Sequence, residues 1–214
     1  MSYIKRITMQ KLHNFVKDNS YLSIVERKSP KEANSFFKKL LLKPFNINHE
    51  LFKKNILKDV KNMLDEVLSN KIKEHSFYKH WVKDMANISQ IFCDMMEDTS
   101  IKISLESSRT CKRYHIDNVP IRLLVTYYGK GTEWIPNHAC DYSAYYNGEN
   151  NNKIIKDNAE KKFIEDWDIA VFKGQRYKGG EKAILHRTPD SALVKLSLLM
   201  RLDNKACLSD NFKY

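Results

Sequence analysis

Two stretches in the first hundred residues repeat apolar side chains every three or four positions. One stripe runs from residue 51 to 67 and the other from 77 to 95, with lysine and other polar residues between the apolar ones. This spacing places the apolar side chains on one face of a helix. Another helix is expected to begin near Ser29, because Pro30 and Glu32 follow it at positions that favour a helix start. The apolar faces of these helices need a partner surface.

From residue 99 onward the apolar residues occur in short runs rich in β-branched and aromatic side chains, which is typical of strands. The runs are IKISLESS, IRLLVTYYG, DIAVFKG, KAILHR and LVKLSLLMRLD. Helices followed by strands indicate an α+β fold, in which a helical region, residues 1–98, packs on a sheet formed by residues 99–214. Residues 136–166 are polar and too long for a hairpin turn, so we expect an excursion or lid.

The net charge of +11 raises the question of nucleic-acid binding. The lysines are spread among acidic residues on the helices, which favours solvated helix surfaces and leaves a basic nucleic-acid-binding module as an alternative. No apolar run reaches the length of a signal peptide core or a membrane span. The cysteines form no CxxC pair and favour neither a zinc ribbon nor a disulfide framework, so a cytoplasmic protein is expected. They are Cys93, Cys111, Cys140 and Cys207.

The candidate chemistry begins at the head of the second strand-like run, where His115 and Asp117 stand two positions apart. Side chains alternate across a strand, so both point to the same side and can reach one metal ion. His186, at the end of another short run, supplies a third ligand. Two histidines and one carboxylate leave coordination positions open, as non-haem Fe(II) chemistry with dioxygen requires. The sequence thus predicts a metal centre and catalytic triad of His115, Asp117 and His186.

A rival ligand set is present nearby. His138 and Cys140 could join His115 in a site that contains a thiolate, and cysteine ligation favours zinc. Such a site would imply a hydrolytic or purely structural role. The identity of the bound metal distinguishes the two hypotheses. A cupin-like metal-binding protein without oxygenase activity, possibly with zinc, is a further alternative.

The order of these elements resembles the double-stranded β-helix of the Fe(II)/2-oxoglutarate-dependent oxygenases. The HxD pair, a long apolar strand, an excursion, DIAVFKG, His186 and then Lys195 follow one another in that order. The resemblance implies a cupin-like jelly roll with the helical layer packed on its sheet. It also implies 2-oxoglutarate as cosubstrate, with Lys195 pairing with its distal carboxylate. The reaction would be hydroxylation or demethylation of a substrate that the sequence does not specify, whether small molecule or macromolecule.

A closer resemblance covers residues 105–203. The phrases CKRYHIDNVPIRLLVTYYGKGTEWIP, DIAVFKG, HRTP and LSLLMRLD are similar to those of the domain-of-unknown-function family 1826. This family has no assigned activity, so the resemblance supports the fold and the choice of the three ligands. Arginine looks usual in the family where this chain has Lys195, and lysine would pair with a carboxylate as a point charge. The helical half offers no such resemblance.

Four residues are predicted to bind the cofactor or cosubstrate. Lys195 and Ser197 share one face of the last run and could hold a carboxylate by charge-assisted hydrogen bonds. Arg113 would lie on the same face as His115, and Tyr127 would supply an apolar wall. Further candidates to line the pocket are Arg122, Trp134 and Arg187.

Overall fold

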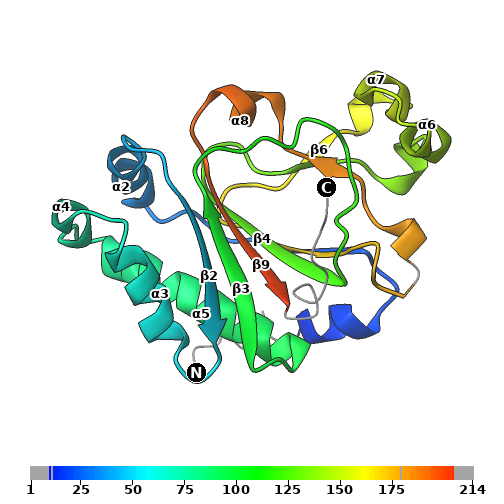
Figure 1. The fold of residues 1–214 in the computed structure, drawn as a ribbon. Coiled ribbons are helices and arrows are strands. Elements are labelled where there is room, and N and C mark those ends of the chain that lie inside the picture. The colour runs from blue at the N-terminus through cyan, green and yellow to red at the C-terminus, as the bar shows by residue number, and fades with distance from the viewer. Residues whose placement is uncertain (1–9, 11, 179, 205–214) are drawn as a thin grey trace.

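The computed structural model describes residues 10, 12–178 and 180–204 (Figure 1). It contains a six-stranded antiparallel sheet in the order β1-β7-β4-β9-β3-β2 and a three-stranded antiparallel sheet in the order β6-β5-β8. The strands are β1 (Leu22–Val25), β2 (Asn46–Phe52), β3 (Ser100–Glu106), β4 (Ile121–Tyr128), β5 (Glu133–Trp134), β6 (Lys162–Phe163), β7 (Ile169–Lys173), β8 (His186–Arg187) and β9 (Leu198–Asn204). The α-helices are α2 (Ala33–Leu40), α3 (Ile56–Asp65), α4 (Asn70–Lys73), α5 (Tyr78–Met96), α6 (Tyr142–Tyr146), α7 (Asn151–Ile154) and α8 (Asp190–Val194).

The N-terminal region is not wholly helical, so the prediction for residues 1–98 needs correction. Strand β1 pairs with β7 and strand β2 pairs with β3, which places one N-terminal strand at each edge of the large sheet. The stripe assigned from residue 51 begins as a helix only at Ile56. Ile47 and Leu51 are both buried, and residues four apart share a face in a strand as well as in a helix. Pairing with β3 decides between the two.

Helices α2, α3 and α5 cover one face of the large sheet (Figure 1). Helix α5 matches the predicted stripe over residues 77–95, whereas α2 begins about one turn after Ser29. Leu123, Val125 and Tyr127 of β4 point toward these helices and belong to the main core. Leu124, on the alternating face, packs instead with Ala170, Phe172 and Leu199. The large sheet therefore has two buried faces, and only one is covered by helices.

The strand predictions in the second half hold for β3, β4 and β7 and fail in part near the C-terminus. The run that includes residues 193–203 is divided, because residues 190–194 form α8 and β9 begins at Leu198. Pro189 immediately precedes α8 and cannot donate to a sheet ladder, which favours a break there. The excursion at residues 136–166 holds α6, α7 and the short strand β6. None of the helices in the described ranges is long and apolar enough to cross a membrane.

Candidate metal centre

The two histidines are brought together by backbone pairing. The amide of His115 donates to the carbonyl of His186 at 3.0 Å, and the amide of His186 donates to the carbonyl of His115 at 3.1 Å. The imidazole ring centroids lie 4.6 Å apart. His186 belongs to β8, so this pairing extends the small sheet by one bridge to the segment that carries the HxD pair.

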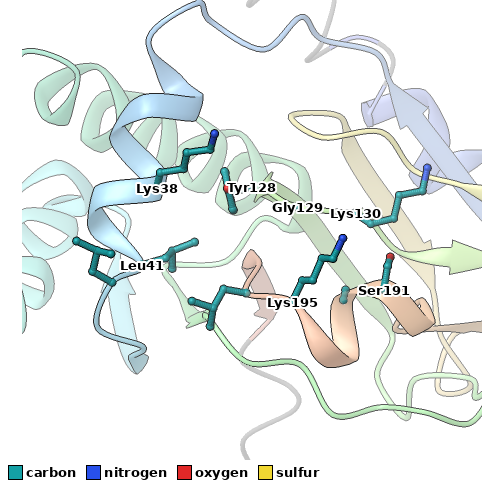
Figure 2. Close-up of a pocket in the computed structure, with 10 residues that line it drawn as sticks. Lys38, Leu41, Tyr128, Gly129, Lys130, Ser191 and Lys195 are labelled. Carbon is teal, nitrogen blue, oxygen red and sulfur yellow. The ribbon is translucent and has the colours of Figure 1, made fainter.

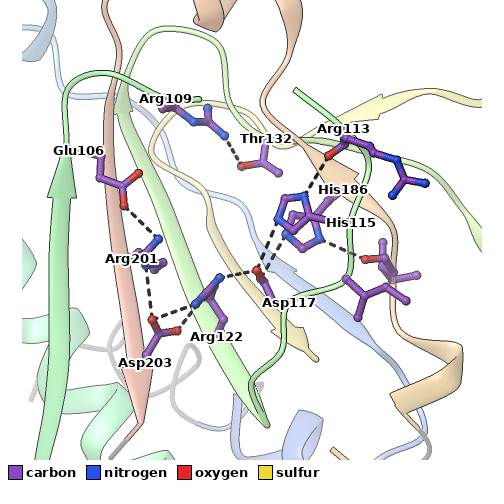
Figure 3. A network of polar contacts seen from close by, with 12 residues as sticks. Glu106, Arg109, Arg113, His115, Asp117, Arg122, Thr132, His186, Arg201 and Asp203 are labelled. Atoms are coloured by element: carbon purple, nitrogen blue, oxygen red, sulfur yellow. Dashed lines mark hydrogen bonds and ion pairs between the residues drawn. The ribbon is translucent and has the colours of Figure 1, made fainter. Parts of the chain in front are cut away.

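Asp117 completes the cluster (Figure 3). Its Oδ1 lies 3.5 Å from Nε2 of His115, and its Oδ2 lies 3.2 Å from Nε2 of His186. One ligand atom from each of the three residues lies within 4.8 Å of the others. The structure therefore brings together the three side chains that the sequence singled out.

Hydrogen bonds to the backbone set the orientation of both imidazoles. Nδ1 of His115 lies 3.1 Å from the carbonyl oxygen of Arg113, and Nδ1 of His186 lies 3.1 Å from that of Ile184. A carbonyl only accepts, so each Nδ1 donates to it and each Nε2 points toward Asp117, where it can act as a metal ligand. The outer-shell bond on Nδ1 is the arrangement that metal-ligating histidines use.

Burial and the neighbouring charges act in opposite directions on the pKa values of Asp117 and His115. Burial alone would raise the pKa of Asp117, but the charges of His186 and Arg122 outweigh burial and hold this pKa well below its usual range. Burial likewise lowers the pKa of His115, but the hydrogen bond and charge of Asp117 outweigh it and the net pKa is raised. Asp117 is therefore an anion, and His115 gains a proton more readily than an exposed histidine.

The donor set fits a divalent metal. Asp117 is only 5% exposed, and its Oδ2 has no hydrogen-bond partner, although a buried carboxylate oxygen without a partner is costly. A cation bound by Oδ2 and the two Nε2 atoms would remove that cost. Two imidazole nitrogens and one carboxylate oxygen on one side of an ion suit Fe(II) with open positions.

A small cavity of about 50 Å³ adjoins the cluster and is lined by four arginines. Arg187 is held by Glu133 and Asp190, and Arg201 lies 3.0 Å from Glu106. A third, Arg122, contacts Asp117 and Asp203. Three of the four arginines in this wall therefore already have acidic partners.

Arg109 differs from the other three because no described carboxylate lies within ion-pair distance of it. Its Nη1 donates to the carbonyl of Lys130 at 3.1 Å and its Nη2 to the hydroxyl of Thr132 at 2.9 Å, while its buried Nε has no partner. Burial lowers the pKa of Arg109 to about 10. A buried guanidinium with only neutral acceptors is a site for an anion.

Lys195 does not lie in this cavity, which corrects its predicted place. It follows α8 directly, is exposed, and lines a separate groove with Lys38 and Lys130 (Figure 2). The prediction assumed that the last strand already includes residue 195, whereas β9 begins at Leu198. Ser197 is buried, but it packs at the turn that contains Gly129 and is not among the residues that line the cavity.

Tyr127 and Arg113 also lie elsewhere. Tyr127 faces the helices, where its hydroxyl donates to Oδ2 of Asp84 at 2.8 Å. The alternation of β4 puts Tyr127 and the cavity residue Arg122 on opposite faces. The guanidinium of Arg113 turns away from the imidazoles and donates to the carbonyls of Tyr145 and Glu149 (Figure 3). Arg113 contributes to the cluster only through its own carbonyl.

The thiolate-containing zinc site is not formed. His138 is exposed and lies 3.5 Å from Glu160, and the Sγ of Cys140 is buried against the carbonyl of Pro136. Among the described residues, the only group of at least three potential ligands with this spacing is the one containing His115. Cys207 lies outside the described residues.

Sequence reasoning missed Arg109, Thr132 and Glu106 as cavity residues. Arg109 and Thr132 lie in loops, where no periodicity assigns a side chain to a face. Arg201 lines the cavity as the alternation of the last strand predicts, because it lies on the face of β9 opposite the core residues.

The family described as "Protein of unknown function (DUF1826)" matches residues 7–203. The similarity thus includes the helical half, beyond the residues 105–203 on which the sequence resemblance was based. A search of curated proteins finds no match.

Several solved structures are similar to this chain at low sequence identity. The rice dioxygenase for auxin oxidation is 9% identical, with a TM-score of 0.40 over 95% of this chain and 70% of its own. The Fe(II)/(alpha)ketoglutarate-dependent dioxygenase TqaL is 6% identical, with a TM-score of 0.48 over 95% and 89%. A Neurospora crassa protein, solved in complex with alpha-KG and 5-formyluracil, is 8% identical, with a TM-score of 0.36 over 93% and 79%.

Proposed function

We propose that this chain, which belongs to the DUF1826 family, is a non-haem Fe(II)- and 2-oxoglutarate-dependent oxygenase. The observation that carries the proposal is the convergence of Nε2 of His115, Nε2 of His186 and the unpartnered Oδ2 of Asp117. These three atoms would hold Fe(II) on one side and leave the other side open. When bound, the iron would supply the activation of dioxygen.

The order of the strands supports a double-stranded β-helix as the scaffold. From β3 to β9 the chain visits the large sheet, the bridge at His115, the large sheet at β4, the small sheet at β5 and β6, the large sheet at β7, the small sheet at β8 and the large sheet at β9. Such alternation between two antiparallel sheets is expected of a jelly roll. It places the HxD segment and β8 next to each other, as the metal centre requires.

Arg109 takes the role that the sequence gave to Lys195. Its unpaired buried guanidinium, together with the hydroxyl of Thr132, would bind the distal carboxylate of 2-oxoglutarate. Leu124 and Leu199 line the same cavity and would exclude water from the cosubstrate. The ring of Phe172 packs 4.6 Å from that of His186 and restrains this imidazole. The substrate, which would be hydroxylated or demethylated, must approach where His115 is partly exposed.

An anaerobic titration tests the proposal. Protein loaded with Fe(II) should develop a metal-to-ligand absorption band on addition of 2-oxoglutarate, and His186→Ala should lose both the band and the iron. His138→Ala is the matched control, since this histidine side chain is 71% exposed and outside the cluster. Iron retained by His186→Ala would contradict the metal centre. Iron binding without the band would favour the cupin-like protein without oxygenase activity.

A further inference from the structure

The guanidinium of Arg122 lies between a proposed metal ligand and a second carboxylate (Figure 3). Nη1 of Arg122 donates to Oδ1 of Asp117. On its other side, Nε donates to Oδ1 of Asp203 at 2.7 Å and Nη2 donates to Oδ2 of Asp203 at 3.0 Å. The bidentate pair with Asp203 fixes the plane of the guanidinium, so Nη1 has one orientation.

The two oxygens of Asp117 are therefore unequal. Oδ1 accepts a hydrogen bond from Arg122 and lies 3.5 Å from Nε2 of His115, whereas Oδ2 has no hydrogen-bond partner and lies 3.2 Å from Nε2 of His186. A carboxylate can bind a metal through one oxygen or through both. Binding through both would take Oδ1 away from the part-buried guanidinium of Arg122 and break a charge-assisted hydrogen bond, which is unfavourable.

We propose that Arg122 is a positioning residue that restricts Asp117 to binding the metal through Oδ2 alone. The inference rests on the proposed function, because it assumes the metal centre. Its consequence is that Asp117 occupies a single coordination position. Three positions then remain open, which is the number that a two-point cosubstrate and dioxygen need together.

The test counts water molecules on bound Mn²⁺, which can replace Fe(II) without reacting with dioxygen. Water-proton relaxation of the Mn²⁺-loaded protein should report three exchangeable waters for the natural chain. Arg122→Gln should report two, because Asp117 is then free to bind through both oxygens. Three waters in Arg122→Gln would overturn the proposal.

Arg27→Gln is the matched control. Arg27 also forms a part-buried pair with a carboxylate, at 2.7 Å from Asp84, but on the helix-covered side of the sheet. Its loss should destabilise the protein to a similar extent and leave three waters on Mn²⁺. If Arg27→Gln also lowers the number of waters on Mn²⁺, a general loss of stability explains the lower number in Arg122→Gln, and the proposal fails.

A second variant, Asp203→Asn, allows the proposal to be tested even if Arg122→Gln does not fold. Asp203→Asn keeps the guanidinium of Arg122 but weakens the bidentate pair that orients it. We therefore expect fewer than three waters on Mn²⁺ and an affinity for Mn²⁺ lowered by roughly tenfold. An unchanged affinity and count in Asp203→Asn would overturn the positioning role. If the natural chain binds no Mn²⁺ at all, the metal centre itself is wrong, which is a different outcome from failure of the Arg122 inference.

Discussion

An arginine pairs with a carboxylate on each side of the large sheet, but the two carboxylates differ in their other partners. On the helix-covered face, Asp84 accepts from Arg27 through Oδ1 and from Tyr127 through Oδ2. On the cavity face, Asp117 accepts a hydrogen bond from Arg122 through Oδ1, while Oδ2 has no donor. Both oxygens of Asp84 thus have donors within the fold, whereas only one oxygen of Asp117 has one. We therefore expect Asp84 to contribute to stability and Asp117 to metal binding.

The largest effect is expected from paired substitutions of these two carboxylates. Asp117→Asn should abolish Mn²⁺ binding, and Asp84→Asn should leave it unchanged. Conversely, Asp84→Asn should lower the free energy of unfolding by about 1–3 kcal/mol, because it removes an acceptor from buried donors. Calorimetric titration with Mn²⁺ and urea unfolding of both variants check this. Metal binding retained by Asp117→Asn would remove the distinction between the two faces.

A second comparison concerns Arg109 and Arg27. Arg109→Met should weaken 2-oxoglutarate binding by roughly 100-fold, as expected for the loss of a charge-assisted pair, and should affect the free energy of unfolding only through the lost hydrogen bonds to Lys130 and Thr132. Arg27→Met should instead lower that free energy and leave 2-oxoglutarate binding unchanged, because it leaves Asp84 with one donor fewer. Titration of the absorption band and chemical unfolding measure the two effects. An affinity for 2-oxoglutarate unchanged in Arg109→Met would contradict the role proposed for this arginine.

Metal binding at the cluster is expected to weaken as the pH falls, because His115 must lose its proton to bind a metal. The raised pKa of His115 means that protons compete with the metal from a higher pH than for an ordinary histidine. In the metal-free protein, the stabilisation that comes from this raised pKa is present below the unfolded value near 6.5 and is lost as the pH rises through the folded value. Mn²⁺ should therefore raise the melting temperature more at about pH 8 than at about pH 6. An equal increase at both pH values would contradict this.

The smallest effect is expected at Lys195. Lys195→Ala should change the affinity for 2-oxoglutarate by less than about twofold, because this lysine is exposed and lines a different groove. The same titration as for Arg109→Met measures it. A loss as large as that of Arg109→Met would return the carboxylate-binding role to Lys195.

Local sequence patterns were sufficient to predict helices α3 and α5, strands β3, β4 and β7, and the three residues of the cluster. Each follows from a local rule: a period near 3.6 for helices, the composition of a strand, and the alternation that puts His115 and Asp117 on one side. His186 could be chosen because it ends a short strand-like run and its imidazole suits a metal.

Only the tertiary structure decided which polar residues share the cavity with that cluster. Tyr127 and Arg122 have similar local sequence signals, but the packing of α2 and α5 buries one face of β4 and leaves the other to the cavity. Lys195 was assigned to the cavity because a strand was extended through residues that fold as α8. Arg109 lies in a loop, and its unpaired charge is visible only when the carboxylates around it have been placed. Ion pairs form between residues that are distant in the sequence, so the local spacing of apolar and polar residues does not predict them.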